Sequence, residues 1–154
     1  KMASPKTMVR PPVFLSGGGG LVGTGRDNLR FAHLLLNGGE LDGVRLLSPR
    51  TVAYMARNHL PGGRLLNEMG QSTFAEEAME GTGFGRGFGT VEDAAAQQNL
   101  ANEGEYSWGG AASTAFWVDP VDELCVVFMT QLLPSSTYPI RRQLRAAVLQ
   151  AVLE

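Results

Sequence analysis

The sequence predicts an α+β fold, an antiparallel sheet with helices packed on its faces. Two apolar runs, "STAFWVDP" and "ELCVVFMTQ", flank the turn sequence "DPVDE", and this pattern is typical of a β-hairpin. Two amphipathic helices are expected before the hairpin, and a third is expected at the end of the chain. This order favours helices that cover an antiparallel sheet. With 154 residues, the chain is long enough for one domain with a hydrophobic core.

The first helix is expected to begin near Thr24, because Thr24 and Asp27 have the spacing of a capping box. Leu29, Ala32 and Leu36 form its apolar stripe, and the sequence "NGG" is a suitable end. The glycine-rich stretch that precedes it, "SGGGGLVG", indicates a loop whose backbone takes unusual angles or approaches a neighbour closely.

The second helix is predicted over "SPRTVAYMARNHL", after a short reversal, "ELDGVRLL", with an Asp-Gly turn. Ser48 is its expected N-cap, Pro49 lies in the first turn, and "PGG" at 61–63 is expected to end it. Residues 64–80 predict an irregular segment with one helical turn. The next stretch, "GTGFGRGFGTVED", predicts a strand against which something packs closely.

The last segment, "YPIRRQLRAAVLQAVLE", predicts a helix that covers one face of the sheet. Its apolar stripe comprises Ile140, Leu144, Ala147, Val148 and Val152. Three predicted strands make a small sheet with an open edge, so the chain is expected to be incomplete. We divide it into an extended or disordered lead, 1–13, and a domain portion, 14–154.

Charge and composition exclude several kinds of partner. The formal net charge is −2 at pH 7, so nucleic acid is not an expected partner. The only lysines are Lys1 and Lys6, which excludes a P-loop and any catalytic lysine beyond residue 6. No run approaches the roughly 18 apolar residues of a membrane span. The N-terminal residues also lack the apolar middle of a signal peptide, and we expect a cytoplasmic location.

Metal and cofactor sites have little support, and none is expected. His33 and His59 lie in separate predicted helices, without paired cysteines or an H-E-x-x-H spacing. Cys125 is interpreted as a small buried residue rather than a reactive thiol, since no basic residue flanks it. The stretch "GGGLVG" at 18–23 matches G-x-G-x-x-G but lacks the preceding buried strand that a dinucleotide site needs.

Candidates for hydrolytic chemistry are scattered. Acidic clusters at 76–80 and 92–93 have the residue types of a carboxylate pair for glycoside cleavage, but a solvated surface is the favoured interpretation. Ser16, Ser107 and Ser113 have no histidine near them in the sequence, and the motif G-x-S-x-G is absent.

The stretch "SWGGAAST" has two interpretations that its residues alone leave open. In the first, it is an edge strand whose glycines allow a helix or strand to pack closely. In the second, it is a binding strand whose bare backbone hydrogen-bonds a substrate carbonyl and donates an N–H to an oxyanion.

Taken together, these segments resemble the C-terminal half of the serine β-lactamase and penicillin-binding-protein superfamily, and most of all the class C-like carboxylesterases (family VIII esterases). The resemblance covers roughly residues 14–154. It rests on the order and spacing of "SGGGGLVGTGRDNLRFAHLLLNGG", "LLSPRTVAYMARN", "GFGRGFG", "GEYSWGGAASTAFWVDPVDELCVVFMTQ" and the last helix. The resemblance implies that the W-G-G stretch belongs to the active-site strand.

Carried over by position, Trp108, Gly109 and Gly110 stand where the lactamases have K-T-G, and they are the expected substrate-binding residues. The resemblance implies that Ala111 donates its backbone N–H as one half of the oxyanion hole. Tryptophan in place of lysine favours an esterase, because that lysine helps to hold the carboxylate of a β-lactam. Ser113 is expected to be structural.

The departures from the family pattern are large. No serine here has a lysine three residues later, so the nucleophile motif S-x-x-K is absent, and so is Y-x-N. Tyr54, Tyr106 and Tyr138 are followed at the second position by Ala, Trp and Ile. The expected function is therefore the C-terminal part of a serine acyl hydrolase, for esters and weakly for β-lactams. Its partner would be an N-terminal half with the serine, lysine and tyrosine. The chain alone is expected to be inactive. The alternative is a non-catalytic binding or interaction module on the same scaffold.

Overall fold

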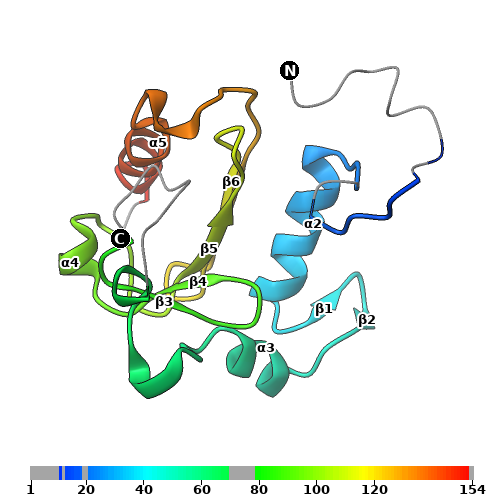
Figure 1. Ribbon diagram of the computed structural model, residues 1–154. Helices are drawn as coiled ribbons and strands as arrows, with labels where there is room; N and C mark the ends of the chain where they lie inside the picture. The colour runs from blue at the N-terminus through cyan, green and yellow to red at the C-terminus, as the bar shows by residue number, and fades with distance from the viewer. Residues whose placement is uncertain (1–10, 12, 19–20, 70–78, 153–154) are drawn as a thin grey trace.

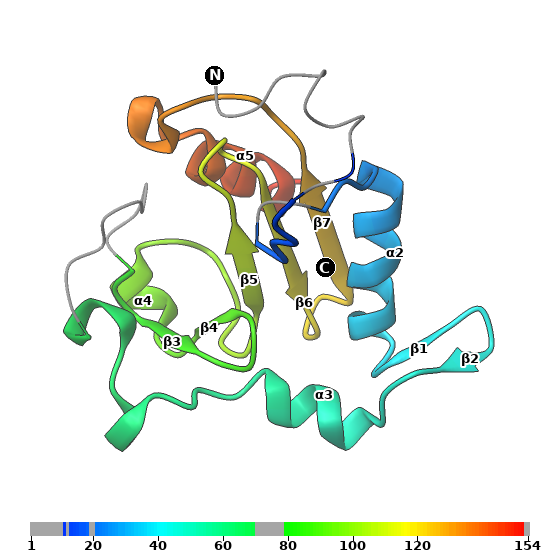
Figure 2. The ribbon, with the colours of Figure 1, turned by 45° about the vertical axis from the view of Figure 1, so that its right-hand side comes forward.

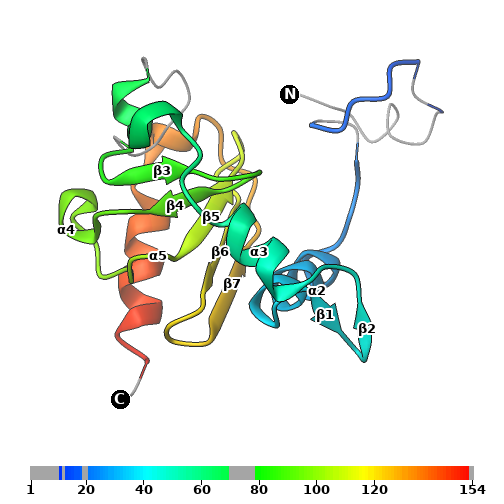
Figure 3. The same cartoon turned by 90° about the horizontal axis from the view of Figure 1, so that it is seen from below.

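The computed structural model describes residues 11, 13–18, 21–69 and 79–152. Five strands form one antiparallel sheet in the order β3-β4-β5-β6-β7, and a two-stranded ribbon, β1-β2, lies apart from it. The sheet stands between helix α5 on one face and helices α2 and α3 on the other (Figures 1 and 3). The predicted α+β class with an antiparallel sheet is confirmed. The strands are β1 Glu40–Leu41, β2 Val44–Arg45, β3 Thr82–Phe84, β4 Gly89–Val91, β5 Tyr106–Gly109, β6 Ala115–Asp119 and β7 Leu124–Phe128; the helices are α2 Gly25–Leu36, α3 Pro49–Met55, α4 Ala94–Gln97 and α5 Ile140–Leu149.

Helix α2 begins as the sequence predicts. The Thr24 side chain accepts from the Asp27 N–H at 3.1 Å, and the Asp27 carboxylate accepts from the Thr24 N–H at 3.1 Å. This reciprocal pair satisfies two N–H groups that the first turn leaves without a helical partner. The predicted stripe is only partly right, because Ala32 and Leu35 are buried whereas Leu29 is exposed. The helix packs on β6 and β7, which sets its buried face.

Helix α3 has the predicted start and a different end. The Ser48 side chain accepts from the Thr51 N–H, as an N-cap does. The predicted end at 61–63 is wrong, because the helix stops at Met55 and "PGG" forms a separate 3₁₀ turn. The Met55 carbonyl accepts from Arg86 N–H at 2.8 Å, which ties the helix end to the β3–β4 hairpin. His59 therefore lies beyond the helix that was expected to contain it.

The single strand predicted over "GTGFGRGFGTVED" is two strands, β3 and β4, joined by a turn that the Gly85 N–H closes on the Phe88 carbonyl at 2.8 Å. The close packing expected at its glycines is confirmed. A Cβ on Gly85 would lie 2.1 Å from the Met55 carbonyl oxygen, and one on Gly83 would lie 2.6 Å from Asn58 Cγ. The glycines therefore bring the hairpin against the segment that follows α3.

The main core lies between the sheet and the helices α2 and α3. It contains Ala32 and Leu35 of α2, Val52 of α3, and Phe88, Tyr106 and Val118 of the sheet region. In the middle strands, residues of one parity face this core, and residues of the other parity face α5. Figure 2 shows the sheet with α2 beside β7.

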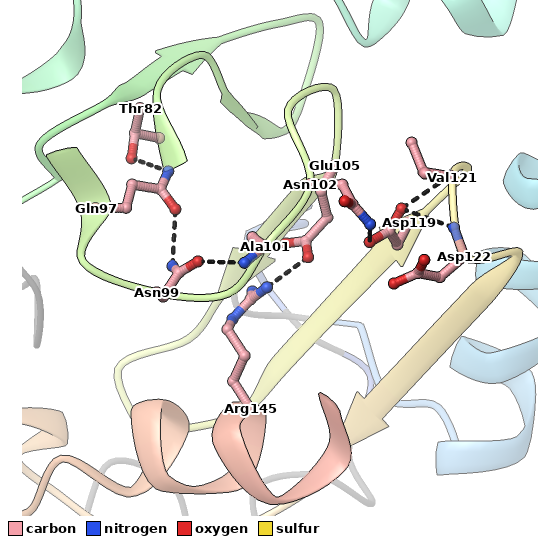
Figure 4. Close-up of polar contacts among 10 residues, drawn as sticks. All are labelled: Thr82, Gln97, Asn99, Ala101, Asn102, Glu105, Asp119, Val121, Asp122 and Arg145. Atoms are coloured by element: carbon pink, nitrogen blue, oxygen red, sulfur yellow. Dashed lines mark hydrogen bonds and ion pairs between the residues drawn. The ribbon is translucent and has the colours of Figure 1, made fainter. Parts of the chain in front are cut away.

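Helix α5 is held to the sheet chiefly by arginines. The predicted stripe is only partly right: Ile140, Leu144 and Val148 are half-buried, whereas Ala147 is exposed and Val152 lies beyond the end of the helix at Leu149. Arg145 makes an ion pair with Glu105 (Figure 4). Its guanidinium also stands 4.7 Å from the centroid of the Trp117 ring. The sequence pattern therefore indicated an apolar side of this helix but did not predict the ion pair between Arg145 and Glu105.

Candidate active site

The W-G-G stretch occupies the C-terminal end of β5, where the sheet loses a strand on one side. Strand β4 pairs only with Tyr106 and Ser107 of β5. Among the described strands, Trp108 and Gly109 pair with β6 alone. The edge-strand interpretation is thus wrong for the first half of β5, which is internal to the sheet. The second half has an open edge, where no described strand pairs with it.

The backbone N–H and C=O groups of Gly109 face away from β6 at this open edge. Their direction follows from the next residue, because the Gly110 N–H donates to the Thr114 carbonyl at 3.0 Å and so points toward β6. Successive residues of an antiparallel strand direct their N–H and C=O groups to opposite sides, so those of Gly109 point to the side that β4 does not reach. An extended ligand could add to the strand there.

Beyond β5 the chain makes a tight turn from Gly110 to Thr114. The Ser113 N–H donates to the Gly110 carbonyl at 3.0 Å, and Ser113 has a φ of 66°. The Ser113 side chain is fully buried, and its hydroxyl donates to the Leu132 carbonyl at 2.8 Å. This contact agrees with the structural role expected for Ser113.

Ala111 and Trp108 are the exposed members of the candidate site. Ala111 is exposed, and its N–H has no hydrogen-bond acceptor among the residues that the structure describes. Trp108 is 42% exposed, and its ring meets Phe84 edge to face at 5.0 Å between centroids. A free backbone donor and an aromatic wall therefore lie three residues apart at the same strand end.

The two glycines have packing reasons of their own. A Cβ on Gly109 would lie 2.9 Å from Arg141 Cζ, and a Cβ on Gly110 would lie 2.6 Å from Thr114 Oγ1. Arg141, at the start of α5, was not singled out from the sequence. The sequence feature that could have identified it is its position four residues before Arg145, because this spacing places both side chains on one face of the helix.

A cavity of about 280 Å³ lies between α5 and the middle of the sheet. It reaches Ser107, Trp108 and Gly109 of β5, and Arg141 and Arg145 line it from the helix. Strand β5 therefore borders a cavity on its α5-facing side.

Burial keeps two titratable groups of the sheet protonated. Burial raises the pKa of Tyr106 to about 12, so its phenol is neutral at physiological pH and is unsuited to be a general base. Burial also raises the pKa of the Cys125 thiol, which is half-buried beside the core, in line with the interpretation of Cys125 as a packing residue.

The other sequence candidates do not form sites in the described part of the chain. No group of three metal-ligating side chains occurs there. The glycine-rich stretch 18–23 follows residues 13–18, which form no strand, so the dinucleotide pattern lacks its structural context. The cluster at 92–93 is structural, since Glu92 accepts from Thr90 and Asp93 caps α4. Most of the cluster at 76–80 lies outside the described residues.

Membrane insertion through a helix is also without support in the described ranges, because none of their helices combines the length and the hydropathy that a bilayer requires.

Two curated proteins of Mycobacterium tuberculosis are similar to this chain. They are the "Uncharacterized protein MT1414" of strain CDC 1551 and "Protein Rv1367c" of strain H37Rv. Each is 37% identical over 130 residues, which is 82% of this chain and 31% of the relative. The chain thus spans about a third of the length of the curated relatives that it matches.

Two solved structures illustrate the fold that this chain shares. The match to "EstCE1, a hydrolase with promiscuous acyltransferase activity" has a TM-score of 0.63 and 27% identity, and covers 82% of this chain and 29% of that one. The match to unliganded "Simvastatin Synthase (LovD) from Aspergillus terreus" has a TM-score of 0.61 and 23% identity, with 80% and 34% covered, and supports the fold alone. The sequence model of the Beta-lactamase family matches residues 1–150. The chain therefore belongs to the Beta-lactamase family.

Proposed function

We propose that this chain supplies the active-site strand of a serine acyl hydrolase. In this proposal Trp108, Gly109 and Gly110 line the substrate, and the Ala111 N–H stabilises the oxyanion that forms when the acyl carbonyl is attacked. The observation that carries the proposal is the Ala111 N–H, which has no acceptor in the described part of the chain and lies in the turn directly after the open edge of β5. Membership of the Beta-lactamase family supplies the chemical context.

The remaining catalytic groups would come from an N-terminal half outside this sequence. The sequence has no S-x-x-K and no Y-x-N, so it offers no serine with a lysine to take its proton. A nucleophilic serine from that half would attack an ester carbonyl, expel the alcohol and form an acyl-enzyme, and water would then release the acid. We propose short-chain esters as substrates and β-lactams as weak ones.

The outer edge of β7 is the place where we propose that this half joins the sheet. Strand β7 pairs only with β6 among the described strands, and its sequence, "LCVVF", is apolar throughout. An apolar edge without a pairing strand invites pairing with another strand. Addition of the N-terminal half is expected to slow amide exchange in Leu124–Phe128 and to leave β3 unchanged.

Activity of the complete assembly tests the proposal. The chain together with its N-terminal half is incubated with a p-nitrophenyl ester and, separately, with a fluorophosphonate that labels nucleophilic serines. The expected result is hydrolysis with the label on the N-terminal half. Label on a serine of this chain would contradict the assignment, and an assembly without esterase activity would favour the non-catalytic module instead.

The acceptor of the acyl group is a second question that the same assay answers. EstCE1 is described as a hydrolase with promiscuous acyltransferase activity, and it is 27% identical to this chain over the shared region. We propose that the acyl-enzyme is also open to alcohols. Adding a simple alcohol to the ester assay is expected to yield the exchanged ester beside the free acid, and its absence would restrict the enzyme to hydrolysis.

A further inference from the structure

The turn that carries Ala111 is held from behind by an arginine of α5. Arg141 Nη2 donates to the Gly110 carbonyl at 2.6 Å and to the Thr114 carbonyl at 2.9 Å. Arg141 is 31 residues from Gly110 in sequence, so this contact exists only in the folded chain. Arg141 thus links Gly110 and Thr114, the first and last residues of the turn, and does not cover Ala111, which stays exposed.

Planarity of the peptide bond links this contact to the proposed oxyanion donor. The Gly110 C=O and the Ala111 N–H belong to one peptide unit, whose six atoms lie in a plane. In a trans peptide the N–H points opposite to the C=O, so an anchored carbonyl oxygen also fixes the direction of the N–H. The Gly110 oxygen is anchored twice, by Arg141 at 2.6 Å and by the Ser113 N–H at 3.0 Å.

The positive charge of Arg141 also affects the Gly110–Ala111 peptide, in addition to fixing its orientation. A guanidinium is permanently charged and makes stronger hydrogen bonds than a neutral donor does. Donation to a carbonyl oxygen polarises the peptide and makes its N–H a better donor, because hydrogen bonds in a chain strengthen one another. Gly109 permits this approach, since a Cβ there would lie 2.9 Å from Arg141 Cζ.

We infer that Arg141 is a positioning residue, which aims and polarises the Ala111 N–H through the Gly110–Ala111 peptide. Arg141 acts through the peptide and does not itself touch the reacting atoms. The inference rests on the proposed function, because it assigns a supporting group to the same oxyanion donor.

The first experiment follows order in the turn and does not depend on catalysis. Amide exchange is measured in the chain with Arg141→Met, with Arg141→Lys and with Arg142→Met. Arg142 is the matched control, because it neighbours Arg141 on α5 and donates instead to the Gln98 carbonyl at 3.1 Å. Arg141→Met is expected to speed exchange of the Ser113 amide about tenfold or more as the turn loosens. Arg141→Lys should restore part of the protection, and Arg142→Met should change nothing in the turn. Unchanged exchange in Arg141→Met would overturn the inference.

The second experiment measures the same variants in the complete enzyme with a p-nitrophenyl ester. Loss of a whole oxyanion donor lowers kcat by roughly 10²–10³, so its misdirection is expected to lower kcat about ten- to a hundredfold with KM nearly constant. Arg141→Lys is expected to recover part of kcat, and it keeps the test decisive if Arg141→Met does not fold.

The two experiments separate the inference from the function on which it rests. Faster exchange with unchanged kcat would overturn the positioning role and leave the hydrolase assignment intact. An inactive unmodified assembly would overturn the proposed function and with it the positioning of an oxyanion donor by Arg141, while exchange would still decide whether Arg141 orders the turn.

Discussion

The ion pair between Arg145 and Glu105 offers the sharpest test of how α5 is held to the sheet. The Glu105 side chain has no exposed surface, and the Arg145 side chain is 15% exposed. One Glu105 oxygen, Oε1, has no hydrogen-bond partner among the described residues, and the other meets Arg145 (Figure 4). Replacing Arg145 by Met therefore leaves a carboxylate that is buried and without its counter-charge.

The expected loss of stability at pH 8 is large for a domain of this size. Removal of one partner of a buried ion pair costs about 3–5 kcal/mol. The cation–π contact with Trp117 adds roughly 0.5–2 kcal/mol when the guanidinium is removed. Domains are stable by only about 5–15 kcal/mol, so Arg145→Met is expected to remove a large share of the free energy of unfolding.

The loss should also depend on pH in a defined direction. Desolvation raises the pKa of Glu105 above the ordinary value of 4.5, and the charge of Arg145 opposes this rise. A raised folded-state pKa contributes stability that is complete below the unfolded pKa and is lost as pH rises through the folded pKa. Without Arg145 the folded pKa of Glu105 rises further. The variant and the parent should therefore differ least near pH 4.5 and increasingly up to pH 8.

Urea unfolding followed by tryptophan fluorescence measures this, because Trp117 is 2% exposed and lies under Arg145. Arg142→Met is the control on the exposed side of the same helix, with an expected change of less than about 0.5 kcal/mol. The double variant Arg145→Met, Glu105→Gln should lose less stability at pH 8 than Arg145→Met alone, since no buried charge remains. Two results would refute the reasoning. One is a loss of unfolding free energy in Arg145→Met that does not change with pH. The other is a double variant whose loss equals the sum of the losses measured in Arg145→Met and in Glu105→Gln alone.

Two further predictions concern β5. Gly109→Ala is expected to lower the free energy of unfolding by about 1–3 kcal/mol, because the new Cβ would lie 2.9 Å from Arg141 Cζ. Gly23→Ala, whose Cβ would meet nothing nearer than 3.9 Å, is the thermal-melt control, and equal melting temperatures for the two variants would show that the contact yields freely. In an absorbance titration, Tyr106 should ionise at a pH of about 12, so its stabilising contribution persists to about pH 10 and is lost as pH rises through 12. Tyr106→Phe should remove this late component, and a parent chain without any ionisation near pH 12 would contradict the burial argument.

Local signals in the sequence were reliable for the starts of elements. The capping box at Thr24 and the N-cap at Ser48 were correct, because a cap involves atoms only three residues apart. The Asp-Gly turn between β1 and β2 was also correct, since positive φ at Asp42 and Gly43 follows from the residue types. The end of α3 was wrong because its last carbonyl pairs with Arg86, far along the chain.

The W-G-G motif identifies the candidate site in the sequence, whereas the contacts between strands show where the motif lies in the sheet. The sequence predicts three strands, whereas the sheet has five. The segment predicted as one strand forms β3 and β4, and the W-G-G stretch, whose strand character the residues left open, belongs to a strand of its own, β5. The open edge at Trp108 and Gly109 follows from where β4 ends, and no property of the W-G-G residues determines that.

The sequence by itself determined the fold class, the family resemblance and the absence of a serine with a lysine three residues later, because these depend on residue types at short spacings. Only the tertiary structure decided that β5 is open at one end and that Arg141 holds the Gly110–Ala111 peptide. These are contacts between residues 31 or more positions apart, or between strands whose lengths differ. Such contacts form when packing of α2 and α5 on the sheet brings distant segments together, and residue spacing along the chain carries little information about them.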